Sequence, residues 1–485
     1  MSLMRTKSLQ SLLSQADGGG HGLKRTLGPG HLIALGIGAI IGAGLFVRTA
    51  AAAGEASGAA VTLSFIVAAI GCAFAGLCYA EFAAMIPISG SAYAYAYATM
   101  GELIAWIIGW ALVLEYALGA ATVAIAWSEY LNKLLEIFGT RIPFEWCHSP
   151  WDDPSSTGAH GIMNVPALFI LAVLTGVLIK GTKESALLNA IIVVLKVAIV
   201  VLFIVLGWGY INPANHTPYL IPEGTPGHEG FFQHGWGGVM RGASIVFFAF
   251  IGFDAVSTAA QEAKKPERDM PIGILGSLVV CTILYILFGH VLTGVANYTE
   301  FQKAGKEASV AYAISTYMKD YGWLANSVTV AILAGFSSVI LVMLMGQSRV
   351  FYSMANDGLL PKLFSDLHPK FRTPHKSNLI LFVLVGFFAA FVPGSVAGDL
   401  TSFGTLLAFV LVCAGVIIMR VKSPELARPF RTPLVPITPI LGILVCGAMI
   451  ASIDHETLKV AFEWMAVGLL IYFFYSRKHS KLNAA

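Results

Sequence analysis

Runs of about twenty apolar residues recur along the whole of this 485-residue chain. A helix of that length crosses the hydrocarbon core of a bilayer, because each residue adds about 1.5 Å along the helix axis. Hydrophobic residues make up 56% of the chain and charged residues 12%, about half the charged share of a soluble domain. The sequence therefore predicts an all-α polytopic membrane protein. We count twelve transmembrane helices, at residues 31–55, 60–86, 95–130, 163–180, 184–212, 237–262, 271–296, 323–354, 377–393, 399–421, 435–453 and 459–475.

Basic residues are unevenly divided between the two sides of this predicted bundle. With the N-terminus inside, the cytoplasmic segments hold twenty Lys and Arg residues, and the opposite side holds few. Cytoplasmic loops are enriched in Lys and Arg, so we expect both termini to be cytoplasmic. The net charge of +3 is too small to indicate a nucleic-acid partner. The predicted cytoplasmic segments are residues 1–30, 180–183, 263–270, 355–376, 420–434 and 476–485.

The spacing of Cys and His gives no sign of a metal site or of a cofactor. The six cysteines are scattered and no CxxC pair occurs, so we expect neither a disulfide framework nor a metal ion. Residues 1–30 lack the apolar core of a signal peptide and predict a cytoplasmic tail. No GxxxxGK[ST] phosphate-binding loop is present, which argues against an ATP-driven pump. We expect the protein to be no enzyme and to need no cofactor.

Two of the apolar runs are interrupted by glycine. The first contains GIGAIIGAGLF at residues 36–46, and the sixth contains FFAFIGFDAVS at residues 247–257. Irregular backbone persists in a membrane only where protein or a polar cavity covers it. Paired breaks at matching positions are typical of transporters built from inverted repeats, so we expect five helices plus five, followed by two more. The alternative is that Gly38 and Gly42 only allow close helix packing.

Two facing breaks would suit a zwitterionic ligand. The N-terminal end of a half-helix has free N–H groups and partial positive charge that suit a carboxylate. Free carbonyls on the unwound turns suit an ammonium group. We predict that N–H groups around Gly42, Ala43 and Gly44 hold the carboxylate. The carbonyls predicted to contact the ammonium are those near Ile40, Phe248, Ala249 and Ile251.

Longer stretches of the chain resemble a known family. They are GIGAIIGAGLFV, YAEFAAMIPISGSAYAYAYATMGE, FFAFIGFDAVSTAAQEAKKPERDMPIGI, GQSRVFYSMANDGLLP and ARPFRTPLVPITPI. Together they resemble amino acid permeases of the amino acid–polyamine–organocation superfamily, and within it bacterial members of the cationic amino acid transporter family. The resemblance covers most of the chain.

This resemblance implies a LeuT-like inverted-repeat fold and transport by alternating access. We expect a secondary active importer of L-amino acids in the cell (inner) membrane, coupled to protons and independent of sodium. The alternatives are a transporter of Arg and Lys, an amino acid exchanger, or an amino acid sensor that does not transport. The expected partners are the amino acid substrate, protons and the lipid bilayer. Whether a small membrane subunit also binds is left open by the sequence. The expected parts are a tail at 1–30, repeats at 31–212 and 237–421, two helices within 435–475, and a tail at 476–485.

Ionisable side chains inside the predicted helices are candidates for coupling, because charge is costly within a bilayer. Lys196 lies well inside the fifth run, and we expect its ammonium to reach free carbonyls of the first break, in the space where sodium-coupled relatives hold a cation. Asp254 follows the second break, and Glu115 lies midway along the third run. Burial disfavours a charged carboxyl and a nearby ammonium favours it, so either group could take up and release a proton. The alternatives are a structural ion pair for Lys196 and a helix cap for Asp254.

Side chains beside the breaks are candidates for a gate and for selectivity. The ring of Phe248 would cover bound substrate, although ordinary core packing is the alternative for Phe248 and Phe247. The resemblance places Met343 beside the substrate side chain, where a flexible thioether fills the space that Lys or Arg would need. We therefore expect small neutral amino acids such as alanine. Glu81 and Arg349 lie near predicted inner ends, where they would fasten loops or gates.

Overall fold

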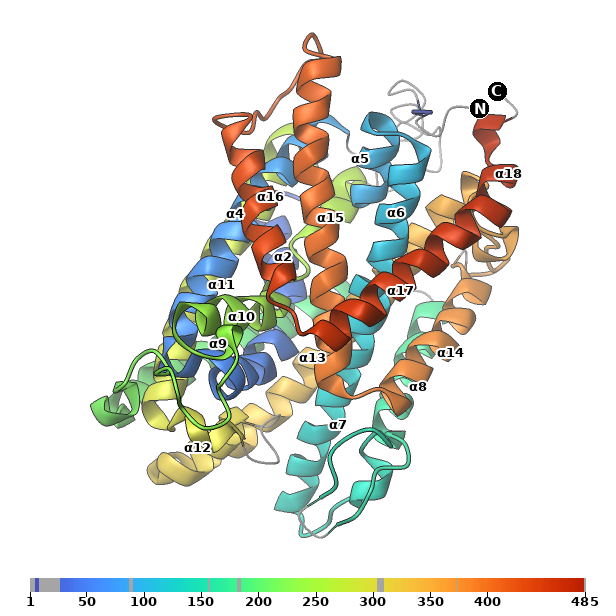
Figure 1. The fold of residues 1–485 in the computed structure, drawn as a ribbon. Helices are drawn as coiled ribbons and strands as arrows, with labels where there is room; N and C mark the ends of the chain where they lie inside the picture. The colour runs from blue at the N-terminus through green and yellow to red at the C-terminus, as the bar shows by residue number, and fades with distance from the viewer. Residues whose placement is uncertain are drawn as a thin grey trace.

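The protein is all-helical in a computed structural model that describes residues 5–7, 27–86, 90–155, 158–180, 185–302, 309–371 and 373–483 (Figure 1). Most of the predicted tail at 1–30 lies outside these residues. The described part contains an isolated bridge between Leu27 and Ala263 and no strand. Its α-helices are α2 (Pro29–Ile40), α3 (Thr49–Ala52), α4 (Val61–Met85), α5 (Ser91–Thr99), α6 (Glu102–Val113), α7 (Gly119–Ile137), α8 (Val165–Lys180), α9 (Ser185–Gly207), α10 (Gly235–Phe247), α11 (Pro266–Val295), α12 (Ser309–Tyr317), α13 (Gly322–Asn356), α14 (His375–Phe391), α15 (Gly394–Lys422), α16 (Ile437–Ala451), α17 (His455–Ile471) and α18 (Arg477–His479).

Eight helical stretches within the described residues are long and apolar enough to cross a membrane. Four further apolar helices, α2, α8, α14 and α16, are shorter. The prediction of one helix over 95–130 is wrong at its start, because α5 ends at Thr99 and α6 begins at Glu102. Gly101 between them has φ +101°, a conformation that glycine adopts readily. The eight long stretches are Gly44–Met85, Glu102–Glu136, Ile191–Tyr210, Gly235–Ser257, Pro266–Val295, Lys319–Asn356, Gly394–Lys422 and His455–His479.

The predicted interruption of the first helix is confirmed. The helix α2 ends at Ile40, and Ile41 has an extended backbone with φ −72° and ψ 106°. Helical structure resumes in a π-helical turn, Gly44–Arg48, which continues into α3. A helix start leaves its first N–H groups without partners inside the helix, so donors face the break.

The predicted interruption of the sixth helix is also confirmed. The helix α10 ends at Phe247 and a 3₁₀ turn, Phe248–Phe250, follows. The chain then turns at Gly252, whose φ of +115° favours glycine, and resumes as a 3₁₀ helix, Asp254–Glu262. A single glycine thus makes the sharp turn that ends the first half of this helix.

The two breaks lie against each other. A Cβ atom on Gly44 would be 2.2 Å from Cα of Ala249, and one on Gly252 would be 3.0 Å from the carbonyl oxygen of Ala39. Only glycine permits the approach at residue 44, since real Cβ contacts are longer, and a Cβ at residue 252 would be in tight contact with Ala39. Helix α11 packs along both α2 and α4 and covers this region.

The two chain ends are joined at one end of the bundle, and the segment between α7 and α8 lies at the other (Figure 1). Nζ of Lys7 lies 2.8 Å from Oδ1 of Asp357, at the end of α13. The guanidinium of Arg5 donates to the carbonyl of Leu482 at 2.9 Å, and the hydroxyl of Ser480 donates to Glu102. These contacts tie residues 5–7 and the segment after α18 to the same face.

Candidate functional site

A tyrosine from α11 bridges the two breaks. The Tyr285 hydroxyl lies 3.1 Å from the carbonyl oxygen of Ile40 and 2.9 Å from that of Ala249. Its ring is fully buried between Phe65 and Phe250. These two carbonyls are among those predicted to hold an ammonium group. Each carbonyl has two lone pairs, so the hydroxyl leaves each of them able to accept a further hydrogen bond.

The predicted carboxylate-binding segment is packed closely by two other helices. Gly44 lies against Ala249, and a Cβ on Gly42 would be 3.1 Å from a methyl carbon of Val339 on α13. Both glycines are buried and face protein. Of the three residues predicted to hold the carboxylate (Gly42, Ala43 and Gly44), Ala43 lines a cavity that leads away from the break.

Met343 lies one helical turn beyond Val339, against a different helix. Its sulfur would be 2.9 Å from a Cβ on Gly119 of α7. The atoms nearest to a Cβ on Gly42 thus belong to Val339, whereas Met343 fills space between α13 and Gly119 of α7.

The paired phenylalanines at the second break differ in their surroundings. Phe247 is fully buried, and its ring contacts Phe409 at a centroid distance of 5.5 Å. Phe248 is 3% exposed and begins the 3₁₀ turn. The contact of Phe247 is ordinary core packing, so the gate hypothesis applies to Phe248. Ile251, predicted to offer a carbonyl, takes the extended conformation that ends this turn.

Lys196 reaches the first break from α9. Its Nζ donates to the carbonyl oxygen of Gly38 at 3.0 Å, and the side chain is buried. Gly38 lies in the last turn of α2, where carbonyls have no partner within the helix. The methylene chain of Lys196 lies along Gly335 of α13. The ammonium therefore joins the first and fifth helical spans, and its part in coupling stays a prediction.

The two candidate carboxyl groups lie side by side, and a tyrosine hydroxyl donates a hydrogen bond to one of them. Glu115 and Tyr116 lie in a π-helical turn, Leu114–Leu118, and π-helical turns are common at functional sites. The Tyr116 hydroxyl donates to Oδ2 of Asp254 at 2.6 Å. Glu115 adjoins Asp254 and, like it, is fully buried. The sequence predicted both acids and missed Tyr116.

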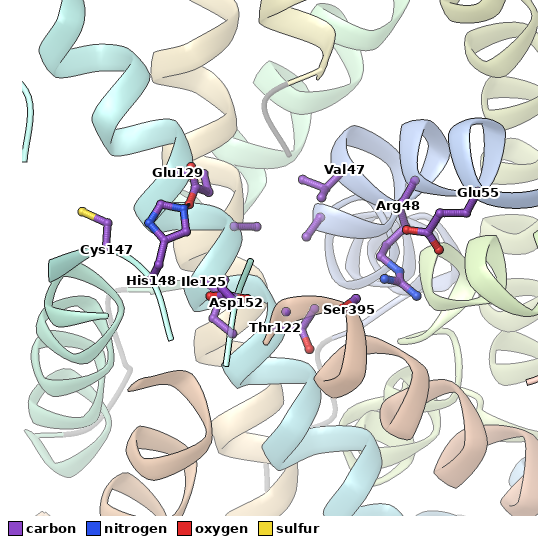
Figure 2. A pocket seen from close by; sticks show the side chains of 14 residues that line it. Val47, Arg48, Glu55, Thr122, Ile125, Glu129, Cys147, His148, Asp152 and Ser395 are labelled. Atoms are coloured by element: carbon purple, nitrogen blue, oxygen red, sulfur yellow. Dashed lines mark ion pairs between the residues drawn. The ribbon is translucent and has the colours of Figure 1, made fainter. Parts of the chain in front are cut away.

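A cavity of about 70 Å³ lies beside Ala43 (Figure 2). Its lining includes Cys147, His148 and Asp152 from the segment between α7 and α8, at the end of the bundle remote from the chain ends (Figure 1). Arg48 and Glu55 line one side of it, and Glu129 and His148 line the other. Nε2 of His148 lies 3.1 Å from Oε1 of Glu129. Burial alone would lower the pKa of His148, but the hydrogen bond and charge of Glu129 outweigh burial and raise it.

Charged groups that are distant in the sequence form a network next to this cavity. Arg48 pairs with Asp399, whose other oxygen lies 2.6 Å from a guanidinium nitrogen of Arg241. The same nitrogen of Arg241 lies 3.9 Å from Asp454. The network joins the π-helical turn after the first break to α10, α15 and the start of α17. No local pattern in the sequence pairs these residues, and the sequence analysis missed them.

Glu81, predicted to lie near the inner end of a helix, has structural partners. Glu81 accepts two hydrogen bonds from Arg420, at 2.9 and 2.8 Å, and one from the N–H of Thr432 at 2.7 Å. It fastens the segment between α15 and α16 to α4, as predicted. The ring of His290 lies near that of His216, at a centroid distance of 4.6 Å and an interplanar angle of 35°. Within the described residues, no group of three or more His, Cys, Asp or Glu could hold a metal ion.

Comparison with known proteins identifies the family. A family model described as amino acid permease matches residues 27–474. The chain is 43% identical over 484 residues to the branched-chain amino acid permease BcaP of Bacillus subtilis, with 99% of each chain covered. It is 40% identical over 482 residues to the methylthioribose transporter of the same species, again with 99% of each covered. It is 35% identical over 427 residues to the vacuolar cationic amino acid transporter 2 of Arabidopsis thaliana, covering 87% of this chain and 64% of that one.

These matches confirm the resemblance to permeases of the amino acid–polyamine–organocation superfamily. They span both breaks and nearly every helix described above. The relatives are transport proteins, and their similarity extends over the full bundle. The chain therefore belongs to the amino acid permease family, and it is a multi-pass membrane transport protein and not an enzyme.

Proposed function

We propose that this protein is a secondary active importer of neutral L-amino acids, driven by protons and independent of sodium. The observation that carries the proposal is the contact between the two breaks at Gly44 and Ala249. Free N–H groups of one half-helix and carbonyls of both breaks meet there, which is the chemistry that an amino acid backbone needs. In this proposal the carboxylate binds at residues 42–44, and the ammonium binds carbonyls of residues 40, 248, 249 and 251.

The proposed architecture has twelve spans. The first repeat covers 31–212 and the second covers 237–421, with two helices at 435–475 and tails at 1–30 and 476–485. The eight long stretches and four shorter apolar helices support this count, with α2 and the Gly44–Met85 stretch together forming the first two spans. Both tails lie in the cytoplasm of the proposed carrier. The cavity beside Ala43 then opens toward the outside, where substrate would enter.

Lys196 supports sodium independence. Its Nζ donates to the Gly38 carbonyl, so in this proposal the lysine takes the place of a cation at the first break. A sodium ion added there would meet an unscreened positive charge in a medium of low dielectric constant. In the proposed cycle the transported cation is a proton carried by the carboxyl pair of Glu115 and Asp254.

Neutral substrates are favoured by the apolar side chains around the breaks. Val339 contacts Gly42, and Met343 fills the space beyond it. BcaP, the 43% identical relative, is named for branched-chain amino acids, and this supports an aliphatic substrate. The proposed range runs from alanine, which was expected from the sequence, to the branched-chain amino acids.

Counterflow in proteoliposomes tests this function. Liposomes loaded with unlabelled amino acid should take up labelled L-alanine or L-leucine, and an inward proton gradient should raise accumulation with sodium absent. Arginine, lysine and an amino acid methyl ester should compete poorly, because the ester lacks the carboxylate. Absence of counterflow would favour a sensor, a requirement for sodium would refute the coupling, and effective competition by the ester would refute the backbone grip.

A second candidate substrate follows from one comparison. The methylthioribose transporter is 40% identical over almost the entire chain, close to the value for BcaP. Methylthioribose carries neither an ammonium nor a carboxylate, so it would not use the half-helix ends in the same way. Competition by methylthioribose against labelled amino acid in the same liposomes separates the two candidates.

A further inference from the structure

The continuous helical stretch Glu102–Glu136, which comprises α6, the π-helical turn and α7, packs against α13 in a register that places a buried glutamine at the level of Glu115. Met343 lies against Gly119, Tyr116 lies against Gly346, and Met354 lies against Gly109. As the number rises on one helix it falls on the other, so the two helices run antiparallel. The same register places Gln347 of α13 at the level of Glu115.

The polar atoms gathered at this level lack protein partners among the described residues. Both oxygens of Glu115, Oδ1 of Asp254, and both polar atoms of the Gln347 amide have none. All three side chains are 0% exposed. Buried polar groups are usually satisfied, and an unmet donor or acceptor costs free energy. Unpaired groups in one place therefore point to an exchangeable partner, such as a proton or a water molecule.

Tyr116 makes the two carboxyl groups unequal. Its hydroxyl donates to Oδ2 of Asp254 at 2.6 Å, the length typical of a hydroxyl that donates to a charged carboxylate. A donated hydrogen bond favours the charged form of the acceptor. The hydroxyl nearest to Glu115, that of Thr405, donates to the Thr401 carbonyl at 3.1 Å, so the short hydrogen bond in this pair is the one to Asp254. Two adjacent buried carboxylates cannot both remain ionised at low cost, so the proton belongs on the group without this short hydrogen bond.

We propose that Glu115 carries the transported proton and that Tyr116 is a positioning residue, which holds Asp254 as the ionised partner of Glu115. This inference rests on the proposed function, because it assigns roles within proton coupling. The protonated Glu115 donates its O–H to the free Oδ1 of Asp254. On the inner side this proton passes to water, and Glu115 is left as a carboxylate.

Gln347 suits both states of Glu115. An amide has an acceptor oxygen and two donor hydrogens, so it can accept from the acid or donate to the carboxylate. Release of the proton leaves two like charges beside each other, and their repulsion favours a conformation in which water enters. The proton is thereby coupled to the conformational change through its differential affinity for the two states. The other titratable groups near the pair are the phenols of Tyr79 and Tyr95 and the thiol of Cys413.

Proteoliposomes separate these roles through counterflow and proton-driven accumulation, both measured from about pH 5 to 8. The probe is labelled L-alanine, or L-leucine where wild type does not exchange alanine. Glu115→Gln should retain counterflow and lose both accumulation and pH dependence. Asp254→Asn should still accumulate, with its half-maximal pH lowered by about one unit, because deprotonation of Glu115 no longer sets two charges together.

Tyr116→Phe should retain counterflow and raise the half-maximal pH by about one unit, which corresponds to roughly tenfold tighter proton binding. Tyr130→Phe on α7 is the matched control, since Tyr130 is also buried and its hydroxyl contacts the backbone of Phe46 and Val310. The shift should vanish in the Asp254→Asn background if Tyr116 acts through Asp254.

Three results would overturn the inference while leaving the proposed function intact. They are proton-driven accumulation by Glu115→Gln, loss of pH dependence in Asp254→Asn alone, and either an unchanged pH profile or lost counterflow in Tyr116→Phe. Lost counterflow counts against it because a residue that acts only through Asp254 leaves exchange intact. A wild-type carrier that ignores the proton gradient would instead refute the proposed coupling itself.

Discussion

The side chain of Lys196 occupies the space that a side chain at Gly335 would fill. A Cβ at position 335 would lie 2.8 Å from Cε of Lys196, 3.2 Å from its Cγ and 3.4 Å from its Cδ. The glycine on α13 thus gives the lysine a path across the helix to the Gly38 carbonyl.

Gly335→Ala should therefore impair coupling without touching the ammonium itself. Overpacking of this kind costs about 1–3 kcal/mol, so proton-driven accumulation should fall roughly tenfold. Accumulation ratios in proteoliposomes measure this. Gly176→Ala on α8 is the control, because a Cβ there meets nothing within 4 Å. Equal accumulation by both glycine variants would contradict the role given to this contact.

Tyr285→Phe should weaken the hydrogen-bonded contact between the two helix breaks. It removes the donor to the carbonyls of Ile40 and Ala249, and an unmet buried acceptor costs about 1–3 kcal/mol. Thermal unfolding in detergent should shift to lower temperature, and the Kd for the amino acid should rise. Tyr210→Phe, which removes an exposed hydrogen bond to Asp320, should change neither quantity. An unchanged Kd in the Tyr285→Phe protein would show that this hydroxyl takes no part in amino acid binding.

Phe248→Ala should reduce uptake about tenfold or more, while folding remains intact. The ring begins the turn at the second break and is almost fully buried, so its loss opens the proposed binding site to water. Initial rates of uptake at fixed protein density give the measurement. Phe169→Ala on α8, where the ring is 60% exposed, serves as the control. Uptake at the wild-type rate would remove Phe248 from the gate.

Met343→Ser should broaden the substrate range. The thioether fills space between α13 and Gly119 of α7, and the smaller serine should admit the side chain of arginine or lysine without any added acid. Inhibition of labelled alanine or leucine uptake by each of the twenty amino acids measures this range. Met345→Ser, two residues along α13, is the control. The idea fails if the two variants give the same competition profile as wild type.

His148 should make the stability of the cavity wall depend on pH. Glu129 raises the pKa of His148 in the folded protein, so the pairing contributes its full stability below the ordinary histidine pKa of about 6.5. That contribution is lost as the pH rises through the raised folded pKa. The gap in unfolding temperature between wild type and His148→Gln should be about 1–3 °C near pH 5.5 and should shrink above neutrality. His160→Gln, an exposed loop variant, should leave no gap.

Local chemistry made part of this site predictable from the sequence. Glycine marked both breaks, because Gly44 allows an approach that no side chain permits and Gly252 allows a positive φ. Lys196 was recognisable because an ammonium far from any interface needs an acceptor, and the nearest free acceptors lie at a break. Length and hydropathy identified the long spans, whereas α5 and α6 are separate helices because of the conformation of Gly101.

The remaining parts depend on how distant helices are turned toward one another. Tyr285 lies in an ordinary apolar run, and nothing local reveals that its hydroxyl meets two breaks. Val339 and Met343 lie one turn apart on α13, and only the packing of α13 decides which one contacts Gly42. Arg48 and Asp399 are 351 residues apart, so their ion pair has no signal in either segment.

The closeness of Gly44 to Ala249 changes how evolutionary variation at this position should be interpreted. A side chain on residue 44 would collide with the backbone of Ala249, so exchanging Ala249 for glycine would not relieve the clash. Selection against larger residues here would act on every member with this geometry, whatever that member carries. Invariance of Gly44 across homologues would therefore record a shared steric requirement of the scaffold and carry no information about ligand choice. Differences at neighbouring side chains such as Val339 and Met343 are where specialisation can leave a trace.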